Sequence, residues 1–212
     1  MSDQLLDQPV RQFLDELASG APAPGGGSVA ALSGAMAAGL LTMVCDLTIG
    51  KQAYAAFEDE ARSIRARAEI LRAELQSLIQ ADVEVFTTLM AAYKLPRATD
   101  ADAAGRKAAI QRATRAATEV PLRTAQAAAA LLPLCGPLAR HGSRNAVSDV
   151  GVAAQLIRAA LPSALLSVDI NLPVLEDTLF VGQTRDAVAA LTNELDQRVG
   201  EVLAVVQERI AS

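Results

Sequence analysis

Apolar residues recur at alternating steps of three and four through the middle of the chain, which predicts a helix of about ten turns packed along one seam. The members of this stripe are Phe57, Ala61, Ile64, Ala68, Leu71, Leu75, Leu78, Asp82, Phe86, Leu89 and Tyr93. Pro96 follows the stripe, and because proline cannot continue a helix we expect the element to end before it. One member of the stripe, Asp82, is not apolar.

The rest of the chain is also patterned for helices. The predicted elements are a short amphipathic helix at Leu5–Leu17, a buried helix from Ser28 to about Thr48 that Gly50 ends, helices at Ala101–Thr118 and Pro121–His141, the second kinked by Pro133 and Pro137, a helix that opens at 143–151, an irregular patch at 167–173 and a last helix from Val188 to Ile210. No internal repeat and no strand-turn-strand pattern occurs. We therefore expect a single all-α domain over residues 1–212, built as a bundle of long antiparallel helices.

Asp82 stands where the seam calls for an apolar side chain. Burying a carboxylate there costs several kcal/mol unless the group is paired or hydrogen-bonded. Two interpretations remain open at this stage. Asp82 is either a structural hydrogen-bond acceptor or a ligand-binding or catalytic carboxylate with a shifted pKa.

The segment Pro22–Ser28 places three successive glycines before an uncharged stretch that reaches Cys45. Ser28 is a candidate N-cap, and the helix behind it would direct its unpaired N–H groups at an anion or a carbonyl group. The segment is not a P-loop, because no Lys followed by Ser or Thr comes after its second glycine, and it lacks the preceding strand of a dinucleotide fingerprint. It is therefore either a ligand cradle or a flexible entry turn.

Two further polar residues lie near helix ends. Asp149 shares a helical face with Val152 and Leu156, so we expect it to point along the buried side and to act in function; the alternative is an acid that only complements the helix dipole. His141 is the single histidine of the chain and is placed in the last turn of a helix. There it either answers the C-terminal dipole or takes part in catalysis.

Composition narrows the function classes. Hydrophobic residues make up 51% of the chain, aromatic residues 3%, and the net charge of -5 argues against a nucleic-acid partner. Cys45 and Cys135 lie in apolar stretches without a metal-ligand cluster, and one histidine excludes a di-iron bundle, so no metal is expected. The N-terminus has no signal-peptide pattern and Val29–Cys45 is short for a membrane span, so we expect a cytoplasmic protein without a membrane partner.

Five motifs occur in a fixed order along the chain: Pro22–Leu32, Gly50-Lys51 with Tyr54, Ala92–Pro96, Ser148–Gly151 and Ile170–Leu172. Together they resemble the cyclodeaminase/cyclohydrolase family of folate enzymes over nearly the whole chain. The resemblance implies an all-α homodimer that acts on one-carbon tetrahydrofolates, either as a methenyltetrahydrofolate cyclohydrolase or as a formiminotetrahydrofolate cyclodeaminase. Because these 212 residues contain no transferase domain, we expect the cyclohydrolase, which hydrolyses 5,10-methenyltetrahydrofolate to 10-formyltetrahydrofolate and needs no cofactor.

The resemblance also suggests residue roles. Asp149 or Asp82 would orient and deprotonate the attacking water, and Lys51 would donate a proton or stabilise the developing oxyanion, unless it is an ordinary solvated lysine. The residues expected to bind substrate are Gly25, Gly26, Gly27, Ser28, Tyr54, Lys94, Arg97, Arg144, Asn145, Ser148 and Asn171. The three cations among them would meet the carboxylates of the folate glutamate tail or simply lie on the surface.

Three residues depart from the family pattern: Asp46 where Asn is common, Ser143 in a Gly-Asn-x-Asn-like turn, and Ser167 for Asn before Val168. They bear on the pterin contacts rather than on the family. A function of another class also remains open, namely a helical dimer that binds folate or supports a partner without catalysis.

Overall fold

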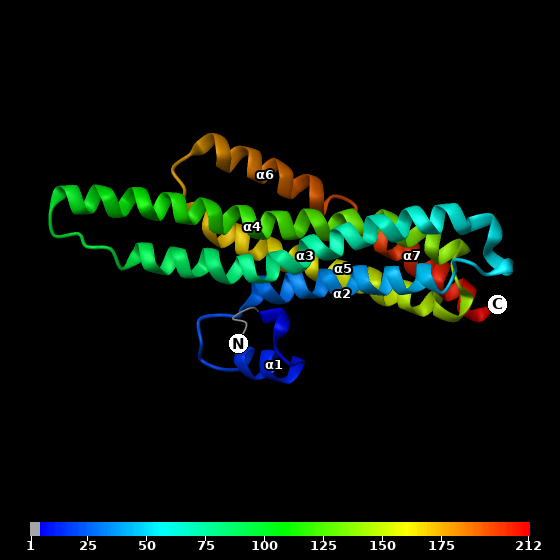
Figure 1. The fold of residues 1–212 in the computed structure, drawn as a ribbon. Coiled ribbons are helices and arrows are strands. Elements are labelled where there is room, and N and C mark those ends of the chain that lie inside the picture. Colours follow the sequence, from blue (N-terminus) through cyan, green and yellow to red (C-terminus); the bar gives the residue numbers. More distant parts are fainter. Residues whose placement is uncertain (1–4) are drawn as a thin grey trace.

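The computed structural model describes residues 5–212, and almost all of them are helical (Figure 1). In chain order the elements are η1 (Leu5–Asp7), α1 (Val10–Leu17), α2 (Gly26–Asp46), η2 (Gln52–Phe57), α3 (Glu58–Tyr93), α4 (Asp100–His141), η3 (Arg144–Ala146), α5 (Val147–Asn171), η4 (Leu172–Val174), α6 (Thr178–Thr192) and α7 (Leu195–Ala211), where η marks a 3-10 helix. Residues 5–212 contain no strand, so the all-α prediction is confirmed.

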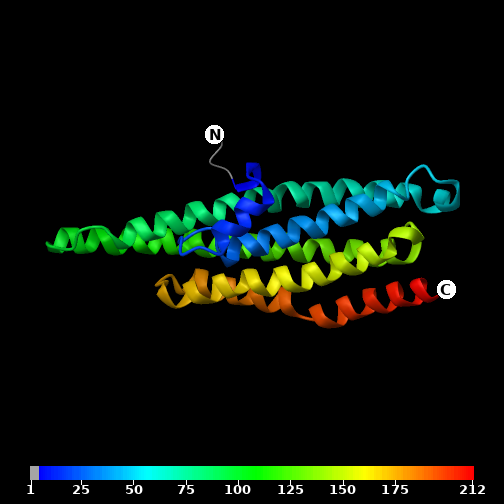
Figure 2. The same cartoon turned by 90° about the horizontal axis from the view of Figure 1, so that it is seen from below.

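Four long helices form the body of the molecule. Helices α2, α3, α4 and α5 follow one another up and down, and each packs against the next, with α5 returning to lie against α2 (Figure 2). Helix α7 covers α4 and α5 at one end, and α6 lies along α4. The α3–α4 hairpin extends beyond the other helices as an arm (Figure 1).

Small residues allow these helices to approach closely. Alanine supplies much of the buried core, for example Ala37 and Ala38 on α2 and Ala153 and Ala154 on α5, all of which are inaccessible to solvent. A Cβ at Gly34 would lie 3.0 Å from a methyl group of Leu75, so any larger residue would require the Leu75 side chain to move. Leu, Ile and Val fill the remaining volume, as a core poor in aromatic residues requires.

The long seam helix is predicted almost to the residue, whereas α4 is longer than predicted. A capping box between Thr99 and Asp102 starts α4, which then continues without a break through Pro121, Pro133 and Pro137. The prediction of two helices, the second beginning at Pro121, is therefore wrong. An internal proline costs about 3 kcal/mol, and the packing of α4 along both α3 and α5 outweighs that cost.

The prediction of an irregular patch at 167–173 is also wrong. Helix α5 continues to Asn171, and the 3-10 helix η4 follows it directly. Conversely, the single last helix is two helices. Glu194 adopts the left-handed region at φ 59° and so interrupts the helix between α6 and α7. The apolar spacing runs across this break, so the pattern alone could not locate it.

The start and end of α2 differ from the prediction as well. Helix α2 begins at Gly26 with Gly25 as its N-cap, so Ser28 is not the cap but a residue of the first turn. The helix ends at Asp46, and Gly50 lies four residues beyond it, in a turn that requires its positive φ of 73°.

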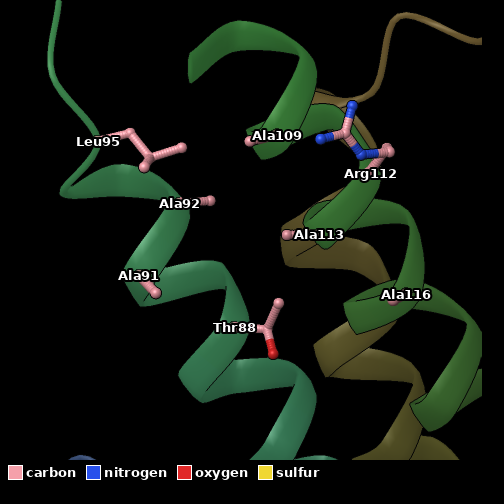
Figure 3. Close-up of a pocket in the computed structure, with 8 residues that line it drawn as sticks. All are labelled: Thr88, Ala91, Ala92, Leu95, Ala109, Arg112, Ala113 and Ala116. Carbon is pink, nitrogen blue, oxygen red and sulfur yellow. The ribbon is translucent and has the colours of Figure 1, made fainter. Parts of the chain in front are cut away.

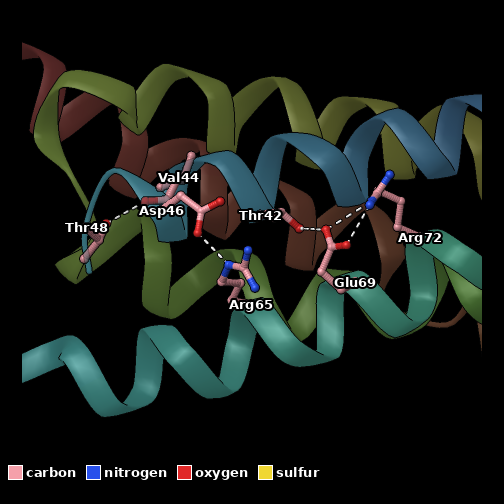
Figure 4. Close-up of polar contacts among 7 residues, drawn as sticks. All are labelled: Thr42, Val44, Asp46, Thr48, Arg65, Glu69 and Arg72. Carbon is pink, nitrogen blue, oxygen red and sulfur yellow. Dashed lines mark hydrogen bonds and ion pairs between the residues drawn. The ribbon is translucent and has the colours of Figure 1, made fainter. Parts of the chain in front are cut away.

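Thr48 fastens this turn to the beginning of the η3–α5 segment. Its Oγ1 donates to the carbonyl oxygen of Val44 at 2.7 Å (Figure 4) and accepts the backbone N–H of Ser143 at 2.8 Å, and Thr48 is fully buried. We expect Thr48→Val to leave the Ser143 N–H unpaired and to lower the free energy of unfolding by about 1–3 kcal/mol, measured by denaturant titration. The matched control is Thr42→Val, which removes a partly exposed hydroxyl that donates to Glu69. Equal losses in the two variants would contradict this account.

Candidate functional site

A pocket of about 430 Å3 lies between the glycine loop, the second half of α3 and the last turn of α5. It is lined by Pro22, Ala23, Gly25, Gly26, Gly27, Asp82, Val85, Phe86, Leu89, Met90, Tyr93, Ala117, Ser167, Ile170, Asn171 and Val174. Its volume is within the usual range for small-molecule sites, which are mostly apolar with a few polar groups. The predicted loop, the predicted acid and the predicted asparagine therefore meet in one cavity.

The glycine loop forms the polar side of this pocket. Gly25 is extended and caps α2, so the first N–H groups of the helix belong to Gly26, Gly27 and Ser28, and the N–H of Ser28 already bonds to Asp82. The first N–H groups of a helix have no acceptor within it and carry its positive dipole end. The loop is thus able to receive a carbonyl oxygen or an anion, which is what the cradle interpretation requires.

Asp82 packs directly against the loop. A Cβ at Gly27 would lie 2.1 Å from Oδ1 of Asp82, so position 27 accepts no side chain while the carboxylate stays in place. The hydroxyl of Ser28 lies 2.9 Å from Oδ2 of Asp82 and 3.2 Å from the carbonyl oxygen of Ile79. The glycine run therefore serves two purposes, because it exposes backbone donors and makes room for a carboxylate.

Burial raises the pKa of Asp82, and hydrogen bonds from the side chain and backbone of Ser28 oppose that rise only in part. No charged side chain contributes to the shift. A carboxyl group in such surroundings can give and take a proton nearer to neutral pH than an exposed aspartate can. Of the two interpretations of Asp82, this favours the functional one.

Aromatic and apolar side chains of α3 form the opposite wall. Phe86 and Tyr93 line the pocket one and three turns after Asp82, and Tyr93 is 40% exposed. The guanidinium group of Arg106 lies 6.0 Å from the centre of the Tyr93 ring and donates to the Tyr93 carbonyl oxygen. The apolar stripe predicts Phe86 and Tyr93 as seam residues; their spacing from Asp82 on one helical face is the signal that they line a site.

Two polar side chains of α5 complete the pocket. The Nδ2 group of Asn171 donates to the carbonyl oxygen of Ala117 at 2.9 Å, which fixes the amide and leaves Oδ1 as its free acceptor. Ser167, one turn earlier, lines the same cavity. Of the three departures from the family pattern, only Ser167 is therefore a pocket residue.

The other two departures from the family pattern, Asp46 and Ser143, make contacts that join parts of the fold outside the pocket. The carboxylate of Asp46 pairs with Arg65 across α2 and α3 at 2.5 Å (Figure 4). Ser143 is buried and donates its backbone N–H to Thr48. Neither residue lines the pocket.

A second group of predicted residues lies at the other end of the bundle. Its members lie in the segments that join α2 to α3 and α4 to α5 and in the first turn of α5: Lys51, Tyr54, Arg144, Asn145, Ser148 and Asp149. The Tyr54 hydroxyl accepts the backbone N–H of Arg144 at 3.0 Å, which links the two segments. Helix α2 separates this end from the glycine loop by its 21 residues, a length of about 30 Å. One chain therefore does not bring Lys51 or Asp149 to Asp82.

Asp149 does not point along the buried side of α5, contrary to prediction. It is half-buried, and Val152, on the same face, is 50% exposed. The face that packs on α2 and α4 carries Val150, Ala154 and Ile157 instead. The pattern detected an apolar face correctly, but that face is left uncovered in the single chain.

The remaining predicted residues lie in the loop at the tip of the arm or at the end of α4. Lys94 and Arg97 are exposed just beyond Tyr93, and neither lines the pocket. His141 is the last residue of α4, as predicted, and its ring lies 5.4 Å from that of Phe57. It does not line the pocket.

A different cavity, of about 360 Å3, lies between the ends of α3 and α4 (Figure 3). Small residues such as Ala91, Ala92 and Ala113 make up most of its lining, and Arg112 is its one ionisable residue. It has no carboxylate and no glycine loop, so it lacks the groups that acid–base chemistry needs.

Other kinds of site find little support within residues 5–212. No group of three or more His, Cys, Asp or Glu side chains in this range could hold a metal ion. Burial raises the pKa of both Cys45 and Cys135 to about 12, which makes these thiols unreactive. Helix α2 and the segment Arg144–Val174 are long and apolar enough to span a membrane, and about half of each most apolar window is buried inside the protein.

Comparison with known proteins gives consistent results. Residues 9–190 match the family described as Formiminotransferase-cyclodeaminase. The chain is 40% identical over 200 residues to a methenyltetrahydrofolate cyclohydrolase of Methylorubrum extorquens, which covers 93% of this chain and 96% of that protein. It is 35% identical to a formimidoyltransferase-cyclodeaminase of Sus scrofa over 98% of this chain, and it spans 38% of that longer protein.

A solved structure resembles the whole fold. The crystal structure of a formiminotetrahydrofolate cyclodeaminase from Thermotoga maritima aligns with a TM-score of 0.86 at 27% sequence identity. The alignment covers 98% of this chain and 100% of that one.

Proposed function

Because the chain belongs to the formiminotransferase-cyclodeaminase family, we propose that it is a methenyltetrahydrofolate cyclohydrolase, which hydrolyses 5,10-methenyltetrahydrofolate to 10-formyltetrahydrofolate. Asp82 is the residue on which this assignment depends. A half-buried carboxyl group with a raised pKa faces a pocket whose other polar lining is the backbone of the glycine loop and the side chains of Asn171, Ser167 and Tyr93. That combination suits proton transfer at a flat, polar-edged ring system.

The alternative activity within the family is formiminotetrahydrofolate cyclodeaminase, which releases ammonia. The identity to the cyclohydrolase of Methylorubrum extorquens is 40%, against 35% for the Sus scrofa formimidoyltransferase-cyclodeaminase and 27% for the Thermotoga maritima cyclodeaminase. The two reactions share the bicyclic methenyl cation, as product in one and substrate in the other. A pocket built for that cation therefore serves either reaction, and the cyclohydrolase is favoured by the relative of higher identity.

The reaction needs few groups from the protein. The bridging carbon of the substrate is already electrophilic, so a positioned water can attack it while a base takes one water proton. The product of this step is a neutral tetrahedral carbinolamine. It collapses when the bond from this carbon to N5 breaks, N5 takes up a proton, and the hydroxyl loses its proton as the formyl C=O forms. The net change is addition of one water and release of one proton.

Asp82 can perform both proton transfers. As a carboxylate it accepts the proton of the attacking water, and as a carboxylic acid it returns that proton to N5. A raised pKa helps the second role, because a strongly acidic aspartic acid would be deprotonated between the two steps. Its negative charge also stabilises the cationic substrate in an otherwise apolar cavity.

The rest of the pocket supplies binding groups. We propose that the N–H groups at Gly25, Gly26 and Gly27, together with Asn171, hydrogen-bond the polar edge of the pterin, and that Phe86 and Tyr93 pack on its rings. Lys94 and Arg97 lie beyond Tyr93, where a glutamate tail leaving the pocket would pass. The hydrolysis needs neither a metal nor an organic cofactor, and we place the protein in the cytoplasm.

We further propose that the protein is a homodimer. Helices α2 and α5 run side by side (Figure 2), and each leaves large apolar side chains exposed, which together we name the α2–α5 face. Its exposed members are Met36, Met43, Leu47, Val152, Leu166 and Ile170, with exposed fractions from 39% to 75%. An uncovered apolar face of this length marks an interaction surface, and a second copy offers a surface of the same kind.

A two-fold axis perpendicular to this face would also bring the two groups of predicted site residues together, one group from each protomer. The face ends at the pocket, through Ile170, and at the other end near Lys51 and Asp149. A two-fold contact pairs the same patch on both protomers, so antiparallel packing sets the second group of one protomer beside the pocket of its partner. Lys51, Tyr54, Arg144, Asn145, Ser148 and Asp149 would then complete the site of the partner subunit.

A pair of assays on purified protein tests the reaction. We expect the absorbance of methenyltetrahydrofolate to decay faster than its spontaneous hydrolysis, and formiminotetrahydrofolate to yield no ammonia. Ammonia release with accumulation of methenyltetrahydrofolate would instead identify a cyclodeaminase. Folate binding without turnover in either assay would favour the non-catalytic dimer.

A further inference from the structure

Ser28 occupies a position that substrate cannot reach. It lies in the first turn of α2 and is fully buried, so its hydroxyl faces α3 rather than the pocket. The expectation that its side chain binds substrate is therefore replaced by a different role. Its contacts are all with Asp82 and with the α3 backbone one turn earlier.

The Ser28 hydroxyl has one hydrogen and two acceptors within reach. Oδ2 of Asp82 lies at 2.9 Å and the carbonyl oxygen of Ile79 at 3.2 Å. A hydroxyl also has two lone pairs, so it can accept a bond while donating another. The Asp82 carboxyl group itself is confined, because the backbone of Gly27 leaves no room on that side. A change in protonation must therefore be accommodated by the partner rather than by movement of the carboxyl group.

From this geometry we infer that Ser28 is a positioning residue whose hydroxyl rotates between Asp82 and the carbonyl group of Ile79, and so supports Asp82 in both protonation states. When Asp82 is a carboxylate, the Ser28 O–H donates to Oδ2. When Asp82 is protonated, its own O–H donates to Ser28 Oγ, and the Ser28 hydrogen turns to Ile79. No heavy atom needs to move. The inference rests on the proposed function for its catalytic meaning, because a base that later acts as an acid must be held in both states.

No other titratable side chain that lines the pocket is close to Asp82. Among the residues that line the pocket, Tyr93 is the only other one with a titratable side chain, and it lies three turns away on α3. The glycine loop, α2, α4 and α5 present no charged side chain to the cavity. The Ser28 hydroxyl is thus the one side-chain partner of Asp82 among the described residues that line or adjoin the pocket.

The first test is the titration of the Asp82 carboxyl carbon by NMR, assigned by its loss in Asp82→Asn. We expect Ser28→Ala to raise the pKa of Asp82 by about one unit, because a charge-assisted donor to the carboxylate is lost. Ser28→Thr keeps the hydroxyl and should restore the wild-type value. Ser33→Ala is the matched control, since the Ser33 hydroxyl donates to its own helix at Val29. An unchanged pKa in Ser28→Ala would overturn the inference, whatever the protein does to folates.

The second test concerns rotation. If the hydroxyl serves both states, Ser28→Ala lowers the melting temperature both below and above the pKa of Asp82, with the larger loss above it. A loss confined to the higher pH would show a donor that serves the carboxylate alone and would overturn the rotation. In turnover, the acid limb of the pH–rate profile should move upward with the NMR value in Ser28→Ala and return in Ser28→Thr. Should wild type show the NMR behaviour but hydrolyse no methenyltetrahydrofolate, the proposed function fails while the role of Ser28 stands.

Discussion

Asp82→Asn lowers kcat for the hydrolysis of methenyltetrahydrofolate by about 10²- to 10⁴-fold, the usual contribution of a positioned acid–base group. Asparagine has nearly the same shape and can still bond to Ser28, but it can neither accept the water proton nor protonate N5. The helical fold should be unchanged by circular dichroism. Glu84→Gln, which neutralises an exposed acid on the same helix outside the pocket, should keep wild-type turnover.

The same substitution should make the protein more stable at neutral pH. The pKa of Asp82 is raised on folding, so between its ordinary value near about 4 and its folded value the native state binds a proton that the unfolded state lacks. Stability therefore falls as pH rises through that window, and above it the half-buried charge of Asp82 destabilises the native state. Thermal melts should show Asp82→Asn above wild type at pH 7, with the gain vanishing near pH 4. A variant that loses both activity and stability at pH 7 would indicate a structural acid.

The sequence identified this pocket through residues that break a local rule. Asp82 interrupts an otherwise apolar stripe, and three successive glycines stand at the start of a helix although glycine is a poor helix former. One contact explains Asp82 and Gly27 together, since the Asp82 carboxylate occupies the space that a Cβ at Gly27 would take, whereas a Cβ at Gly25 or Gly26 would meet no atom within 4 Å. Sites tend to be found where local patterning is violated in this way.

The wrong predictions, for Asp149 and for the limits of α4, α6 and α7, also have a common physical origin. Periodicity reports which face of a helix is apolar but not what covers that face, so it predicts a buried side for Asp149 where the single chain leaves Val152 half exposed. Proline predicts a helix boundary at Pro121, but tertiary packing carries α4 through three prolines. The apolar spacing predicts one last helix, because the change of direction at 193–194 leaves that spacing intact. The distance between the two groups of predicted residues depends on helix length and direction, which motifs do not encode.

Mixing two inactive variants should restore activity. If Asp82 acts with Lys51 of the partner subunit, then Asp82→Asn and Lys51→Ala each inactivate their homodimers. A heterodimer of the two variants contains one site with both substitutions and one site with neither. Random exchange at equal concentrations makes about half of the dimers mixed, so about a quarter of the wild-type activity should return. The measurement is the rate of loss of methenyltetrahydrofolate before and after subunit exchange by mild denaturation and refolding.

Exchange must be shown independently, and the interface offers the control. Met36, 47% exposed, lies near the middle of α2 on the α2–α5 face. Met36→Glu should give a monomer by light scattering and abolish both turnover and rescue. Ile70→Glu, at an exposed apolar residue of α3 outside that face, should remain a dimer. If mass analysis shows mixed dimers of Asp82→Asn and Lys51→Ala without recovered turnover, the composite site is wrong. Lys51 and Asp149 then remain solvated end residues, and the pocket around Asp82 acts within one chain.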